Sequence, residues 1–144
     1  MTIELLNQEL MELELSCALN LSLCLLKMRR YVEARTFLQT FLREGNHADY
    51  CAKGYLRLAR AWLGSADYPE AEHCARAARS SLTRYLSSPA AARRSDLLRP
   101  ELHPVSVRTI TTADLDRLDR DIRVAASRAR VAEKKQYAGM FSSS

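Results

Sequence analysis

Two stretches of this chain carry the same pattern of small and large residues, and the second stretch follows the first after 37 positions. The repeat is clearest at Ala34 and Ala71, which occupy the same place in the two stretches. Self-similarity at a period of this size is typical of stacked helical hairpins. Ser22 and Ala59 are small, and we therefore expect paired helices to approach each other at these positions. Ala34 and Ala71 should lie where the next helix crosses.

Apolar residues recur at helical spacing through both stretches and predict four helices. The expected helices cover residues 3–28, as one long helix or two in series, 32–43, about 49–63 with Asp49 as the cap, and 68 to about 85 with Pro69 in the first turn. They form two helical hairpins, at about 15–43 and about 50–86. The whole chain has only four Gly and four Pro in 144 residues, which is typical of helices packed on helices.

The last part of the chain differs from the two hairpins. Residues 88–111 hold three of the four prolines together with Arg and Ser, so we expect a flexible linker there. Thr111 or Thr112 should then cap a final helix over 112–141, with one edge packed on the repeats and its charged faces in water. The expected apolar stripe of this helix is Leu115, Leu118, Ile122, Ala125, Ala129 and Ala132. The domains predicted are thus repeats over 1–87, a linker and a capping helix.

Charge and motif content narrow the function. A formal charge of +5 predicts attraction to acidic partners, such as nucleic acid, an anionic membrane or a carboxylate-rich peptide. The four cysteines lack C-x-x-C spacing, which favours reduced thiols inside the cell. No apolar run approaches the roughly 18 residues of a membrane span, and the N-terminus is acidic, unlike a signal peptide, so we expect a cytoplasmic protein without membrane contact. No catalytic motif or metal-ligand spacing stands out, so we expect neither enzyme activity nor a metal or other cofactor.

The repeat pattern resembles that of tetratricopeptide repeats. In full, Ala18-x2-Leu21-Ser22-x2-Leu25, Tyr31 and Ala34-x3-Leu38 align with Tyr55-x2-Leu58-Ala59-x2-Trp62, Tyr68 and Ala71-x3-Ala75. Three segments make the resemblance narrower: residues 18–28, residues 52–57, and the closing Tyr-Ala-x-Met-Phe of 137–141. They resemble the co-chaperone tetratricopeptide domains of large immunophilins and of aryl-hydrocarbon-receptor-interacting proteins, over roughly 15–86 and 125–141. The resemblance implies an all-α tetratricopeptide-repeat solenoid of two hairpins plus a long capping helix.

The same resemblance implies a binding site. In that family an Asn from one repeat and a Lys and an Arg from the next form part of a carboxylate clamp, and the matching positions are Asn20, Lys53 and Arg57. It implies that the partner is the acidic C-terminal tail of a cytosolic heat-shock chaperone. The residues themselves are suited to this role, because Lys53 and Arg57 are one helical turn apart and can donate charge-assisted hydrogen bonds to carboxylates.

The resemblance also implies that the clamp is partial. The family's first repeat, which supplies a further Lys and Asn, has no counterpart in the acidic segment 1–14, and no isomerase domain is present in this chain. We therefore expect an adaptor that acts by binding and has no isomerase activity.

Two other functions stay open at this point. The chain could be a structural scaffold, self-associating through Leu6, Leu10 and Leu13 at an exposed N-terminal edge. The other alternative is a basic nucleic-acid-binding protein, which is indicated by the two arginines at 93–94, by Arg99 and by the basic residues of the last helix. Acidic residues are interleaved with the basic ones in that helix and stacking aromatics are missing there, which argues against nucleic acid.

Each clamp residue has a plainer interpretation as well. Lys53 and Arg57 could belong to an ordinary solvated helix face. Asn20 lies between leucines, so it either faces a groove or needs an internal hydrogen-bond partner.

Overall fold

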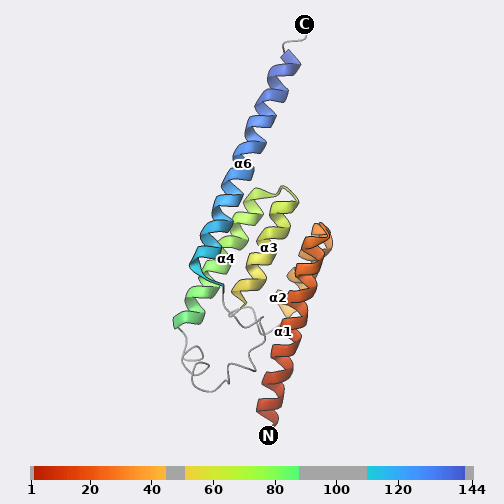
Figure 1. Cartoon of the computed structure of the whole chain (residues 1–144), viewed down its shortest axis with the longest axis vertical. Coiled ribbons are helices and arrows are strands. Elements are labelled where there is room, and N and C mark those ends of the chain that lie inside the picture. The colour runs from red at the N-terminus through yellow and green to blue at the C-terminus, as the bar shows by residue number, and fades with distance from the viewer. Residues whose placement is uncertain (1, 45–50, 88–109, 142–144) are drawn as a thin grey trace.

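The computed structural model describes residues 2–44, 51–87 and 110–141, and these residues form helices, with one short turn described after Lys27 and another after Gly64. The helices are α1 (Ile3–Lys27), α2 (Tyr31–Glu44), α3 (Ala52–Gly64), α4 (Tyr68–Ser87) and α6 (Thr112–Phe141). The all-α fold predicted from the sequence is therefore confirmed for the described residues. Figure 1 shows α1 and α2 as one hairpin, α3 and α4 as the next, and α6 running beside α4. Residues 88–109 of the predicted linker lie outside the described residues.

The first hairpin turns sharply between two long helices. The predicted segment 3–28 is a single helix, and Thr2 caps it by accepting a hydrogen bond from the backbone N–H of Leu5 at 3.4 Å. At its other end Arg29 has a φ of 58°, a left-handed conformation that is uncommon for a residue other than glycine. Arg30 then pairs with Glu33 in the first turn of α2 at 2.6 Å. The turn thus brings α2 back along α1.

The second hairpin has the same construction. Asp67 precedes α4, and its Oδ1 atom accepts a hydrogen bond from the backbone N–H of Glu70 at 3.2 Å. Ala66, with a φ of 60°, reverses the chain before it. Asp49, the predicted cap of α3, lies outside the described residues, and α3 begins at Ala52 with Cys51 in the N-cap position.

The core depends on small residues where helices cross. The four small residues singled out by the repeat pattern, Ser22, Ala34, Ala59 and Ala71, all have 0% of their surface exposed. Side chains of this size let helix backbones approach closely, and larger buried residues fill the spaces beside them. One cluster joins all five described helices through Leu19, Leu38, Leu58, Cys74, Leu118 and Ile122. The full burial of the four small residues agrees with their expected positions where helices approach and cross.

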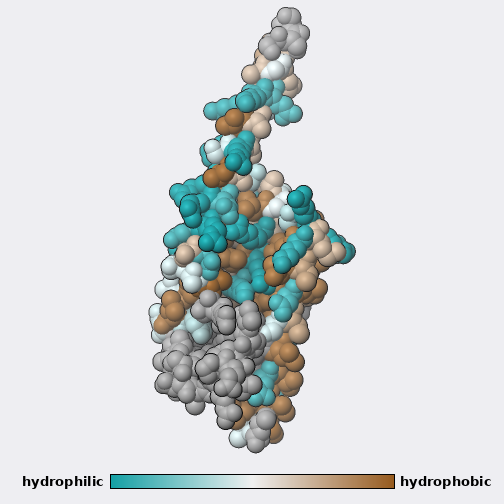
Figure 2. Space-filling model, viewed as in Figure 1, coloured by the Kyte–Doolittle hydropathy of each residue, from teal (hydrophilic) through white to brown (hydrophobic). Residues whose placement is uncertain are grey.

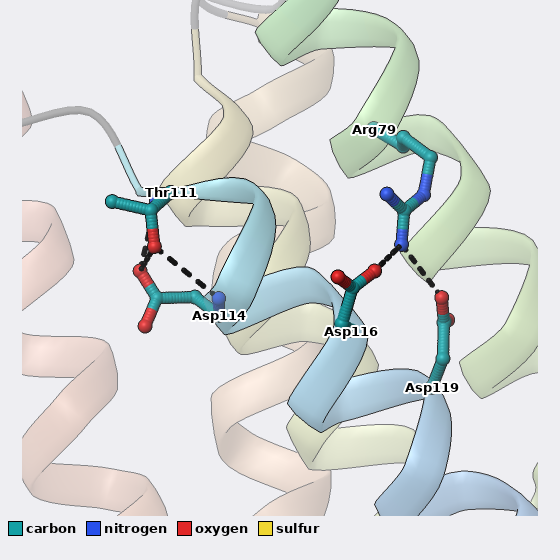
Figure 3. Close-up of polar contacts among 5 residues, drawn as sticks. All are labelled: Arg79, Thr111, Asp114, Asp116 and Asp119. Carbon is teal, nitrogen blue, oxygen red and sulfur yellow. Dashed lines mark hydrogen bonds and ion pairs between the residues drawn. The ribbon is translucent and has the colours of Figure 1, made fainter.

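Helix α6 begins with a capping box at Thr111, the first of the two threonines expected as its cap. The backbone N–H of Asp114 donates to Thr111 Oγ1 at 3.3 Å, and the backbone N–H of Thr111 donates to Asp114 Oδ2 at 2.8 Å. A little further along, Arg79 of α4 pairs with Asp116 at 3.1 Å and with Asp119 at 2.7 Å (Figure 3). The two Arg79 pairs connect the first half of α6 to α4 at the surface.

The predicted apolar stripe of α6 is buried only in its first half. Leu115, Leu118 and Ile122 are buried, whereas Ala125 and Ala129 are half-buried. The expectation is wrong at Ala132, which is exposed like every residue from 130 to 141. The physical reason is length, because the C-terminal half of α6 extends past the hairpins and has no helix beside it among those described (Figure 1).

Candidate functional site

Helices α1, α3 and α6 enclose a groove of about 710 Å³. Its apolar lining comes from Leu23 and Leu26 of α1, Leu56 and Leu63 of α3, and Ile110 before α6. Its basic lining comes from all three helices and consists of Lys27, Lys53, Arg57, Arg60 and Arg117. Asp114 is the one acidic residue among the described residues that line it. Figure 2 shows hydrophilic side chains gathered on the face where α3 lies between α1 and α6.

Arg57 lies at the base of this groove and links two of its walls. Its side chain is 7% exposed, and its guanidinium donates a hydrogen bond to the backbone carbonyl of Leu19 in α1. Burial lowers the pKa of Arg57, although an arginine stays protonated at neutral pH. The interpretation of Arg57 as part of a solvated helix face is therefore wrong. Arg57 is a buried cation, and its guanidinium has further N–H donors besides the one that bonds the Leu19 carbonyl.

Lys53 lies one turn before Arg57 on the same face of α3. It is half-buried and lines the groove near Asp114. The pKa of Asp114 is lowered, first by the hydrogen bond from the backbone of Thr111, then by the Thr111 hydroxyl and by the positive charges of Arg117 and Lys53. Because its carboxylate accepts two hydrogen bonds from Thr111, Asp114 is held at the edge of the groove as part of the helix cap.

Asn20 has a different position from the two cations. Its side chain is exposed, so it is not an internal hydrogen-bonding residue, and it is not among the residues lining the groove. Leu23 and Lys27, three and seven residues further along α1, do line it. Residues at these spacings share one face of a helix. Asn20 thus lies on the α1 face that continues into the groove, directly after the Leu19 carbonyl that Arg57 reaches.

The structure adds three cations that the sequence analysis did not assign to a site. Arg60 is one turn beyond Arg57, a spacing visible in the sequence, and it also pairs with Asp121 of α6 at 2.6 Å. Lys27 follows Asn20 by seven residues and was recognisable in the same way. Arg117 enters the groove only because α6 packs against α3, and no local pattern in the sequence indicates that contact.

Comparisons with known proteins add no identification, because no family model, curated protein or solved structure matches the chain. Over residues 2–44, 51–87 and 110–141, no three His, Cys, Asp or Glu residues are grouped as a metal site would require. None of the helices described is both long and apolar enough to cross a bilayer.

Proposed function

We propose that this chain is a tetratricopeptide-type adaptor whose basic groove binds the acidic C-terminal segment of a heat-shock chaperone. The observation that carries the proposal is the placement of Lys53 and Arg57 one turn apart at the base of a groove with further cations around them. The role is binding without catalysis, in the cytoplasm where such chaperones occur.

The charges of the groove favour a carboxylate-rich ligand. Five basic residues and one acidic residue line it, so the described lining has a net charge of +4. Charge-assisted hydrogen bonds from ammonium and guanidinium groups to carboxylates are roughly twice as strong as neutral ones. Partial burial strengthens them further, because Arg57 is shielded from water. A chain ending in a free carboxylate beside acidic side chains supplies the matching charges.

The apolar part of the lining favours a peptide over a small anion. Leu23 and Leu26 face the groove from α1, and Leu56 and Leu63 face it from α3. A peptide can place a carboxylate on the cations and an aliphatic side chain between these leucines. Asn20, at the continuation of the same α1 face, can donate its amide to the peptide backbone.

Nucleic acid fits the described part of the chain less well. The acidic residues of α6 are held close to basic ones, since Asp116 and Asp119 pair with Arg79, and Asp121 pairs with Arg60. These pairs reduce the positive charge that a phosphate backbone would meet on this half of α6.

Fluorescence anisotropy with a labelled peptide ending in Glu-Glu-Val-Asp tests the proposal. The same peptide with an amidated C-terminus should bind about tenfold or more weakly, because one charge-assisted hydrogen-bond acceptor is lost. Lys53→Gln should weaken the free-acid peptide by a similar factor, whereas Arg76→Gln, which removes an exposed cation on α4, should not. Arg57→Gln is a further variant, checked by circular dichroism because the residue is buried. Equal affinity for the free-acid and amidated peptides would exclude a site for the terminal carboxylate.

A further inference from the structure

Helix α1 is apolar on two opposite faces. The inward face buries Leu19 and Ser22 against the other helices. The outward face carries large apolar residues at alternating spacings of three and four, Ile3, Leu6, Leu10 and Leu13, with exposed surfaces of 79%, 47%, 55% and 59%. Strict alternation of this kind is the seam of a helix that pairs with a second helix. Figure 2 shows hydrophobic residues along the part of α1 nearest the N-terminus.

The C-terminal half of α6 is the second long helical segment without a neighbour among the described helices. The stripe that buries Leu118 and Ile122 continues at the same spacings through Ala129 and Ala132, which leave room for an approaching helix. One large apolar side chain beside this stripe, Met140, is 69% exposed. The stripe of large residues in the buried half of α6 thus continues as a stripe of small residues in the exposed half.

The two segments have opposite charge. Residues 3–14 contain four glutamates and no lysine or arginine, whereas residues 123–141 contain five basic residues and one glutamate. The net charges are therefore −4 and +4. Glu9 and Glu14 occupy the heptad positions that flank the α1 seam, and Arg128 and Lys135 flank the continued stripe of α6 on one side. These are the positions at which charges select the partner of a paired helix.

One copy of the chain cannot bring these segments together. Figure 1 shows that α1 extends from one end of the molecule and α6 from the other. The lengths nevertheless match, because fifteen residues of α1 and nineteen of α6 span roughly 22 and 28 Å at 1.5 Å per residue. The complementary surface for each segment is therefore available on another copy.

We propose that the outer face of α1, from Ile3 to Cys17, pairs with the C-terminal half of α6 of a second copy of this chain. The apolar residues form the buried seam, and the glutamates that flank it meet the basic residues of α6. The groove stays open, since its α1 residues, Leu23, Leu26 and Lys27, lie further along the helix than the paired segment. The assembly is independent of the peptide binding proposed above.

Sedimentation velocity of the full chain over roughly 1 to 100 μM, a range that spans affinities typical of small interfaces, tests the pairing. We expect concentration-dependent association that weakens with added salt. Glu9→Lys/Glu14→Lys and Arg128→Glu/Lys135→Glu should each raise the dissociation constant about tenfold, because each pair of changes removes the net charge of one of the two oppositely charged segments. Glu70→Lys/Glu72→Lys on the exposed face of α4 makes the same charge change as the first variant and should leave association unaltered.

The decisive measurement is a mixture of the two charge-reversed variants. The unchanged α1 of one variant then meets the unchanged α6 of the other, and the new lysines of α1 can face the new glutamates of α6, so association should return toward the wild-type level. A wild-type chain that stays monomeric over the whole range overturns the proposal. The proposal is also overturned if only the α1 variant weakens association and mixing the two variants does not restore it, because this result would show pairing between two α1 helices. Peptide binding measured on the same variants separates failure of this interface from failure of the groove.

Discussion

Replacing Leu118 by alanine tests whether α6 is part of the fold or merely lies beside it. Leu118 has no exposed surface and belongs to the cluster that joins α6 to the two hairpins. The substitution removes three carbon groups, worth roughly 2.4 kcal/mol at about 0.8 kcal/mol for each group transferred from water. The cavity left behind adds to this loss, since close-packed helices collapse only partly. We expect the free energy of unfolding to fall by about 3 to 4 kcal/mol.

Urea unfolding followed by circular dichroism at 222 nm measures this change. Val131→Ala is the matched control, because Val131 lies on the same helix but is 51% exposed. The control should change the free energy of unfolding by no more than about 0.5 kcal/mol. Leu118→Ala should also weaken peptide binding, because α6 brings Arg117 into the groove.

A small loss would refute this account of α6. If Leu118→Ala costs less than about 1 kcal/mol, the side chain is not enclosed as a core leucine is. The groove would then lack its α6 wall, and the contribution of Arg117 to the proposed site would be withdrawn with it.

Three further outcomes follow from the described contacts. The cysteines divide into two reactive and two protected thiols: Cys17 and Cys24 are exposed, whereas Cys51 and Cys74 are buried. Burial raises the pKa of both protected thiols, that of Cys74 to about 11. Two thiols should therefore react rapidly with a disulfide reagent, and the other two only after unfolding. Four equal reaction rates would contradict this. Gly64→Ala should destabilise the fold by about 1 to 3 kcal/mol because a Cβ there would overlap the Tyr31 ring, whereas Gly139→Ala, with open space around it, should not lower the melting temperature. Because the pKa of Asp114 is lowered in the folded state, its ionised carboxylate stabilises the fold at pH values above the usual carboxyl range. This stabilisation is lost as the pH falls through the lowered pKa of Asp114. Helix content should accordingly drop below about pH 4, and Asp114→Asn should flatten the fall; an unchanged acid profile would argue against the cap.

Local patterns in the sequence were sufficient for most of the helices. The hairpins follow from 3.6-residue periodicity, and a threonine cap for α6 follows from the side chains of Thr111 and Thr112, between which the sequence did not choose. Ser22 and Ala59 were identifiable because their volume stands out between large neighbours at helical spacing. Such features depend on residues close in the chain, so they can be predicted without knowing which helices pack together.

The site depends on contacts that no local pattern contains. Arg57 was recognisable as one of a pair of cations, but its burial and its hydrogen bond to Leu19, 38 residues away in the chain, both depend on the packing of α3 against α1. Arg117 reaches the groove through the packing of α6. Periodicity also predicted an apolar stripe through Ala132, but it did not indicate that α6 extends beyond the helices that it packs against. Amphipathic spacing shows that a face can be buried, and only the arrangement of helices shows whether it is.

The first turns of α1 connect the fold to the proposed assembly. An isolated helix of roughly 12 residues is marginal in water, because packing supplies most of the stability of protein helices. The described side chains of residues 2–14 are all exposed, so this segment gains little from the rest of its own copy. If a second copy covers the outer face of α1, helix content per residue should rise with protein concentration and follow the same curve as association. Ellipticity at 222 nm, measured from about 1 to 100 μM across the expected dissociation range, checks this. Association without a rise in helix content would mean that α1 is fully formed alone, and pairing would then not contribute to its folding.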